Sequence, residues 1–116
     1  PATVHAAIAA TAAAHPTRRA VVFEDQALTY RELLERATRL ARRLERLGIG
    51  PGARVGVCVE RSLDLPVAVL GVLLSGAAYL PLDPAFPGER LAYMLEDAGA
   101  AALVTQQRLD GLLPRL

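Results

Sequence analysis

The residues of this chain that could do chemistry are few, and none has the companions that a reactive site needs. Cys58 is the only cysteine, so a disulfide framework or a cysteine-based metal cluster within one chain is excluded. A thiol nucleophile needs a neighbouring base and a third group that orients the base, and the sequence shows no such arrangement. Because Cys58 lies in an apolar segment, we expect a small buried hydrophobe.

The other candidate side chains are more typical of structure than of catalysis. His5 and His15 lie on an alanine-rich segment without the carboxylate or cysteine companions of a metal or acid–base site. Asp83 has the chemistry of a general base or a magnesium ligand, but it stands among prolines, which favours a turn at the start of a helix. Tyr79 could stack on an adenine, yet we expect it to pack in a strand with its hydroxyl group paired.

Three glycines around Pro51, at positions 48, 50 and 52, superficially resemble a loop that binds phosphate. Such loops follow a strand and open a helix, so that the free amides of the helix face the phosphate. This loop instead follows a predicted helix and precedes a predicted strand over 54–60. We therefore interpret it as the end of a helix followed by a turn.

All 13 basic residues are arginines, which excludes mechanisms that need a lysine within these residues. Six of the arginines lie on the predicted helix 30–47, where they form a stripe with the chemistry to bind phosphate or an acidic partner. No aromatic residues alternate with them, as binding of single-stranded nucleic acid would favour. We interpret the stripe as a solvated face. Its arginines are Arg31, Arg36, Arg39, Arg42, Arg43 and Arg46.

The composition indicates one small structural unit whose surface is partly covered by a partner. The net charge of +1 gives no electrostatic reason to bind nucleic acid or an anionic membrane. An apolar fraction of 53% and a mean hydropathy of +0.29 are high for a free-standing small domain. The start shows no secretory pattern, and the single cysteine fits a reducing, cytoplasmic setting.

Residues 65–82 form an uncharged run of 18 residues, which nominally reaches the length of a membrane span. The run contains two prolines and two glycines, and its latter part is typical of a strand. We therefore expect a buried helix followed by a buried strand. The helix, 64–75, is apolar nearly all round, so we expect a larger body to cover it and the lone chain to be poorly soluble.

Periodicity and turn signals predict an α/β fold with a mainly parallel sheet and flanking helices. The clearest element is the helix 30–47, because Thr29 and Glu32 have the spacing of a capping box and Gly48 offers a left-handed end. Its apolar face is predicted at Tyr30, Leu33, Leu34, Ala37, Leu40, Ala41, Leu44 and Leu47. The full set of predicted elements is helices 4–15, 30–47, 64–75 and 88–98, and strands 20–23, 27–29, 54–60, 77–80 and 101–105.

Three collinear segments carry a resemblance to a known family. Residues 28–33 read LTYREL, residues 74–83 read LSGAAYLPLD, and residues 83–91 read DPAFPGERL. They resemble motifs of the adenylation domains of nonribosomal peptide synthetases, which belong to the adenylate-forming superfamily. The departures are Leu74, where the family usually has lysine, Ser75, where it usually has alanine, and Phe86, where it usually has tyrosine.

The resemblance implies that residues 1–116 are an N-terminal fragment of such a domain, within its large N-terminal subdomain. The intact enzyme is expected to form an aminoacyl adenylate from an amino acid and Mg-ATP and to release pyrophosphate. It would then pass the aminoacyl group to the phosphopantetheine thiol of a carrier domain. Its partners would be the remainder of the adenylation domain and the neighbouring condensation and carrier domains, with no nucleic acid and no membrane.

The family's reactive residues come later in its sequences, so we assign no catalytic, cofactor-binding or metal-binding residue within 1–116. The fragment alone is expected to be inactive. Two alternatives stay open. One is a non-catalytic interaction or remnant module, in which the helix 64–75 docks onto another chain or domain. The other is an acyl- or aryl-acid ligase of the same superfamily.

Overall fold

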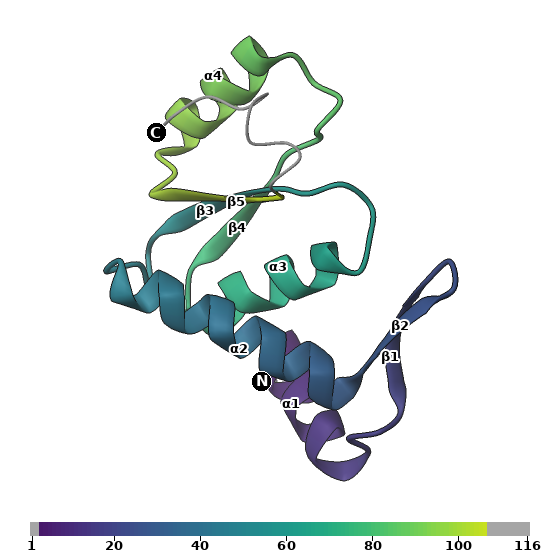
Figure 1. The fold of residues 1–116 in the computed structure, drawn as a ribbon. Coiled ribbons are helices and arrows are strands. Elements are labelled where there is room, and N and C mark those ends of the chain that lie inside the picture. The colour runs from purple at the N-terminus through teal and green to yellow at the C-terminus, as the bar shows by residue number, and fades with distance from the viewer. Residues whose placement is uncertain (1–2, 107–116) are drawn as a thin grey trace.

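The computed structural model describes residues 3–106, which form four helices and five strands (Figure 1). The helices alternate with the strands after an N-terminal helix and hairpin. In chain order the elements are α1 (Val4–Ala14), β1 (Arg19–Phe23), β2 (Gln26–Thr29), α2 (Tyr30–Arg46), β3 (Arg54–Cys58), α3 (Asp64–Leu74), β4 (Ala78–Pro81), α4 (Gly88–Ala98) and β5 (Ala102–Thr105).

The main sheet has three parallel strands with β3 in the centre, in the order β4-β3-β5. Val55 pairs with Tyr79 of β4 on one side and with Ala102 of β5 on the other. The strands β1 and β2 form a separate antiparallel hairpin. The α/β fold class with a parallel sheet and flanking helices is therefore confirmed.

The central strand is buried on both faces because helices cover it on both sides. Figure 1 shows α4 on one side of the sheet and α2 with α3 on the other. Val55 and Val57 join the cluster that contains Leu44 of α2 and Val72 of α3. Cys58 joins the opposite cluster, whose other buried members are Leu82 and two leucines of α4. Small and β-branched residues on both faces of β3 are typical of a parallel strand that helices cover on both sides.

The helix α2 is held at both ends as the sequence predicts. The backbone N–H of Glu32 donates to Thr29 Oγ1 at 3.2 Å, and the backbone N–H of Thr29 donates to Glu32 Oε1 at 2.9 Å. The hydrogen bond from the Thr29 backbone N–H to the carboxylate is the main cause that lowers the pKa of Glu32, and the Thr29 side chain lowers it further. The carboxylate therefore stabilises the fold above its unfolded pKa, and this contribution is lost as the pH falls through the folded pKa. Gly48 follows the helix with a φ of 82°.

Replacing Thr29 with alanine is expected to destabilise the chain by about 1 kcal/mol, because a free N-terminal amide of α2 loses its acceptor. Urea unfolding followed by circular dichroism measures the change. Thr17→Ala is the matched control, since Thr17 is exposed and outside any helix or strand. Equal losses for the two variants would contradict the role of the cap.

Several predicted boundaries and one predicted face need correction. The strand β4 ends at Pro81 rather than residue 80, and β3 ends at Cys58 rather than residue 60. Helical periodicity predicts Leu47 on the buried face of α2, but this side chain is 73% exposed. It lies one residue beyond the helix, where the chain has already begun to turn, so helical periodicity no longer places it.

The apolar helix α3 is covered by this chain more fully than its composition indicates. Ala68, Leu70, Gly71 and Val72 are buried, mainly against α2 and β3. None of its large apolar residues is among the exposed ones. This chain therefore covers one face of the helix, whereas Leu65 and Val69 on another face are half-buried and line an open pocket. The expectation that a larger body covers the rest stays a prediction. Among residues 3–106, no helix has the length and apolar character to cross a membrane.

Candidate functional site

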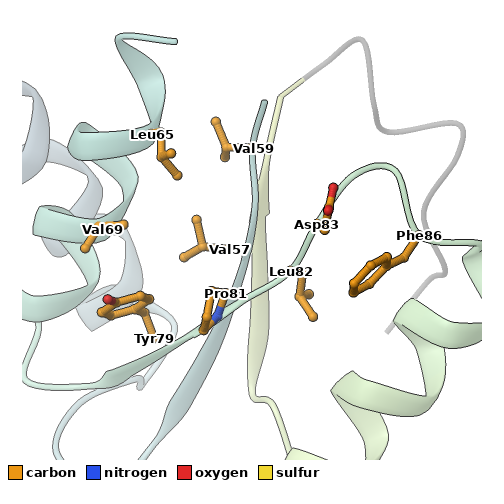
Figure 2. A pocket seen from close by; sticks show the side chains of 9 residues that line it. All are labelled: Val57, Val59, Leu65, Val69, Tyr79, Pro81, Leu82, Asp83 and Phe86. Carbon is orange, nitrogen blue, oxygen red and sulfur yellow. The ribbon is translucent and has the colours of Figure 1, made fainter. Parts of the chain in front are cut away.

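An apolar hollow lies where β3 and β4 end. It is an open pocket of about 490 Å³. Figure 2 shows Leu65 and Val69 of α3 on one side of it and Leu82 and Phe86 on the other, with Pro81 between them. The remaining lining residues are Val57, Val59, Tyr79 and Asp83.

The topology explains why a hollow forms at this place. The helix α3 follows β3 on one face of the sheet, whereas α4 follows β4 on the other face (Figure 1). Two adjacent parallel strands whose helices diverge leave a crevice at their carboxyl ends, which is where open α/β sheets commonly bind ligands. The walls here are apolar apart from the Asp83 carboxylate and the Tyr79 hydroxyl. The pocket can therefore accept an apolar group, but the described residues supply no nucleophile paired with a base.

Asp83 shapes the corner beside this pocket. Its Oδ1 accepts a hydrogen bond from the backbone N–H of Ala85 at 2.9 Å, and its carbonyl oxygen accepts one from the N–H of Phe86 at 3.0 Å. The guanidinium of Arg90 then lies 4.3 Å from the centre of the Phe86 ring. The prediction that Asp83 is a turn residue before a helix is confirmed. The DPAFPGER segment thus forms a turn that is held by its own hydrogen bonds, followed by the first turn of α4.

Tyr79 departs from its prediction. It lies in β4 as expected, but its side chain is 43% exposed and lines the pocket. The strand β4 is at an edge of the three-stranded sheet among the described residues, so one flank of the ring lacks a neighbour. A single sequence cannot show which strand becomes the edge, because strand order depends on the crossover connections.

Cys58 is completely buried in the cluster beneath α4, which confirms the expectation of a small hydrophobe. Burial raises the pKa of its thiol, and the negative charge of Asp83 raises it further. Both effects disfavour the thiolate, which is the reactive form. Cys58 is thus suited to packing rather than to nucleophilic attack.

We expect Cys58 in the folded chain to react with a thiol reagent such as DTNB only as fast as the chain opens. Adding urea should accelerate the reaction by at least about 1,000-fold, because the reagent reaches the thiol only after unfolding. An exposed cysteine introduced as Tyr93→Cys gives the control rate, since Tyr93 is 67% exposed. Comparable rates at the two positions in native buffer would contradict the buried, protonated thiol.

The remaining sequence candidates do not come together into a site. His5 and His15 are at opposite ends of α1. Gly48 and Gly52 both have positive φ in the turn between α2 and β3, as interpreted. In the described part of the chain, no group of three or more His, Cys, Asp or Glu side chains could hold a metal ion. The six arginines of α2 are exposed.

A second hollow is polar and includes two residues of the LTYREL segment, Leu28 and Glu32. It lies between the hairpin, α2 and the start of α3, and its volume is about 500 Å³. Nearby, Gln106 accepts from the backbone N–H of Glu60 at 2.9 Å and donates to Asp64 Oδ2 at 2.8 Å. These bonds join the end of β5 to the β3–α3 connection. The hollow is lined by Gln26, Ala27, Leu28, Glu32, Arg36, Ser62, Leu63 and Asp64.

Comparison with known proteins identifies the family. The sequence profile of the AMP-binding enzymes matches residues 8–115, which is nearly the whole chain. The chain belongs to the AMP-binding enzyme family. Tyrocidine synthase 2 from Brevibacillus parabrevis is 49% identical over 108 residues, covering 93% of this chain and 3% of that protein.

Solved structures place the chain within this AMP-binding family more narrowly. The nonribosomal peptide synthetase FmoA3 superimposes with a TM-score of 0.94 at 40% identity, covering 100% of this chain and 13% of FmoA3. FmoA3 has also been solved with AMPPNP and with α-methyl-L-serine-AMP bound. The N-terminal subdomain of NpsA from Klebsiella oxytoca matches with a TM-score of 0.85 at 27% identity, covering 97% of this chain and 29% of that one.

These matches confirm the resemblance to adenylation domains of nonribosomal peptide synthetases. The resemblance implies a lysine at position 74, where this chain has leucine. Leu74 is half-buried and packs with the cluster of Leu33, Ala37 and Leu70, so it contributes to the contact between α2 and α3. The chain spans a small part of the proteins it matches, for example 3% of tyrocidine synthase 2 and 29% of the NpsA subdomain.

Proposed function

We propose that this chain is the N-terminal part of the large subdomain of an adenylation domain in a nonribosomal peptide synthetase. The observation that carries the proposal is the match to FmoA3 over the whole of this chain, at 40% identity and a TM-score of 0.94. The parent enzyme would form an aminoacyl adenylate from an amino acid and ATP and release pyrophosphate. It would then transfer the aminoacyl group to the phosphopantetheine thiol of a carrier domain.

The partners follow from this role. They are the remainder of the adenylation domain and the adjacent condensation and carrier domains. The similar structures include an artificial fusion of NpsA with a PCP domain, which supports a carrier partner. We place the parent in the cytoplasm, where the single thiol of Cys58 stays reduced.

The residues of this chain are a scaffold rather than a reactive centre. ATP and Mg²⁺ need several polar or charged ligands, but the pocket beside Asp83 is lined mainly by apolar side chains. The apolar lining supports a division in which residues 3–106 supply the sheet and its helices, while Mg-ATP is held by other parts of the parent.

An exchange assay on the isolated chain tests this division. Pyrophosphate exchange into ATP should stay at background with each of the twenty amino acids, and calorimetry should detect no binding of Mg-ATP. FmoA3 serves as the positive control. Amino-acid-dependent exchange by the isolated chain would overturn the assignment of a scaffold role. The remnant alternative predicts that the complete gene product is also inactive, so assaying that product separates the two.

A further inference from the structure

The second half of α2 presents four exposed arginines to solvent. They are Arg39, Arg42, Arg43 and Arg46. Glu45 is the only acidic residue among positions 39–46, and within residues 3–106 no ion pair joins these arginines to a carboxylate. Leu47 follows directly after them and is 73% exposed. The end of this helix therefore offers a concentrated positive charge beside a large apolar side chain.

The outer face of α4 has the complementary pattern. Tyr93 is 67% exposed and lies opposite the buried Leu91 and Leu95. Three exposed carboxylates stand three or four positions from Tyr93, which places them on the same face of the helix. They are Glu89, Glu96 and Asp97. In the part of the chain that the structure describes, none of them forms an ion pair. The guanidinium of Arg90, the single basic residue of α4, is stacked on Phe86.

These two faces cannot meet within one molecule, because α2 and α4 cover opposite sides of the sheet (Figure 1). Each face is therefore open to a second molecule. Arginines bind carboxylates and also stack on aromatic rings, so the α2 face fits both the carboxylates and the tyrosine of α4. An exposed aromatic side chain among charged groups is typical of the centre of a protein contact. Charge complementarity thus identifies the α4 face of a second copy as the occupant of the α2 face.

We propose that copies of this chain associate head to tail, with Tyr93 and its neighbouring carboxylates on one copy against the arginines at the end of α2 on the next. The contact joins two different surfaces, so it is heterologous and can extend beyond two copies. Exposed ion pairs each contribute little, so the contact is weak, with a Kd on the order of 1 mM. Such a contact becomes effective where copies are held at high local concentration. The proposal does not depend on the proposed function.

Sedimentation velocity of the full chain tests the proposal. In about 20 mM salt, where charges are weakly screened, the mean sedimentation coefficient should rise with protein concentration up to about 0.5 mM. In about 500 mM salt, the Kd of the association should rise at least about tenfold, because the attraction between exposed charges is screened. Association through apolar patches would not weaken with salt, so the direction of the salt effect separates the two.

Charge reversal makes the experiment selective for the two faces. Arg43→Glu/Arg46→Glu leaves both faces acidic, whereas Glu96→Arg/Asp97→Arg leaves both faces basic. Each variant alone should therefore stay monomeric in low salt. A mixture of the two should associate, because the acidic α4 face of the first variant matches the basic α2 face of the second. Circular dichroism checks that both variants are folded.

Two further variants separate this contact from a general attraction between charges. Tyr93→Ala leaves every charge in place and should raise the Kd at least about tenfold, since it removes the aromatic centre of the contact. Val22→Ala is its matched control, because Val22 is 60% exposed on the hairpin, and it should leave the Kd unchanged. Glu24→Arg/Asp25→Arg, at the exposed turn of the hairpin, is the control for reversed charge and should leave the association intact.

Four results would each overturn the proposal. They are a chain that stays monomeric in low salt, an association that high salt strengthens, a mixture of the two reversed variants that stays monomeric, and a Tyr93→Ala variant with an unchanged Kd. If a reversed variant does not fold, the salt effect and Tyr93→Ala still decide the question. A monomeric chain that binds phosphatidylserine vesicles through the arginines of α2 would assign this face to a membrane and would also overturn the proposal.

Discussion

Replacing Gly71 with alanine is expected to destabilise the chain by about 2 kcal/mol, although alanine favours a helix by about 1 kcal/mol over glycine. Gly71 lies within α3, where this helix packs against Leu40 of α2. A Cβ atom at position 71 would lie 2.6 Å from Leu40 Cδ2 and 2.9 Å from Leu40 Cβ. Because Leu40 Cβ is fixed to the backbone of α2, the two helices must separate to admit the methyl group.

Urea unfolding of a double-mutant cycle measures this effect. Leu40→Ala should remove much of the clash, so Leu40→Ala/Gly71→Ala should be more stable than the two separate losses predict. Gly50→Ala is the matched control, because a Cβ atom there would meet only Ser75 O at 3.7 Å. A Gly71→Ala variant as stable as the natural chain would show that α2 and α3 do not pack as described.

Replacing Leu95 with alanine is expected to destabilise the chain by about 3 kcal/mol, the usual range for a buried leucine that leaves a cavity. Leu95 is 1% exposed and lies beneath the central strand. Its Cδ2 atom would lie 2.6 Å from a Cβ atom at Gly56, so the absence of a side chain at position 56 makes room for it. The cavity would therefore open directly against β3.

Thermal unfolding and urea unfolding both report this loss. Tyr93→Ala provides the control on the same helix, because Tyr93 is 67% exposed and should cost less than about 0.5 kcal/mol. If the two variants lost the same stability, α4 would not cover the sheet through Leu95.

Features governed by neighbouring residues could be predicted from the sequence. The capping box at Thr29 and Glu32 needs only a three-residue spacing, and its two hydrogen bonds form as expected. The left-handed conformation of Gly48 likewise depends on glycine at the end of a helix. The turn at Asp83 is set by its own side chain and the prolines beside it. These signals are local, so one sequence contains them completely.

Features set by packing between distant segments could not be predicted in this way. Gly71 is typical of a helix breaker when the sequence is considered alone, but in the structure it permits the close approach of α2. The exposure of Tyr79 follows from the position of β4 at one side of the sheet. The apolar pocket combines residues of β3, α3 and the corner after β4. Each of these depends on which elements become neighbours.

The most direct test of the scaffold role is the ATP–pyrophosphate exchange activity of a chimera in which residues 1–116 replace the matched segment of FmoA3. FmoA3 has been solved with the adenylate of α-methyl-L-serine. With this amino acid, we predict that the pyrophosphate exchange rate of the chimera lies within about tenfold of the FmoA3 rate, which corresponds to about 1.4 kcal/mol in the activation barrier. The amino-acid preference should stay that of FmoA3. Hydrogen exchange checks that the chimera is folded. A folded chimera that prefers a different amino acid, or whose pyrophosphate exchange rate has fallen by more than about 1,000-fold, would contradict a purely structural role for these residues.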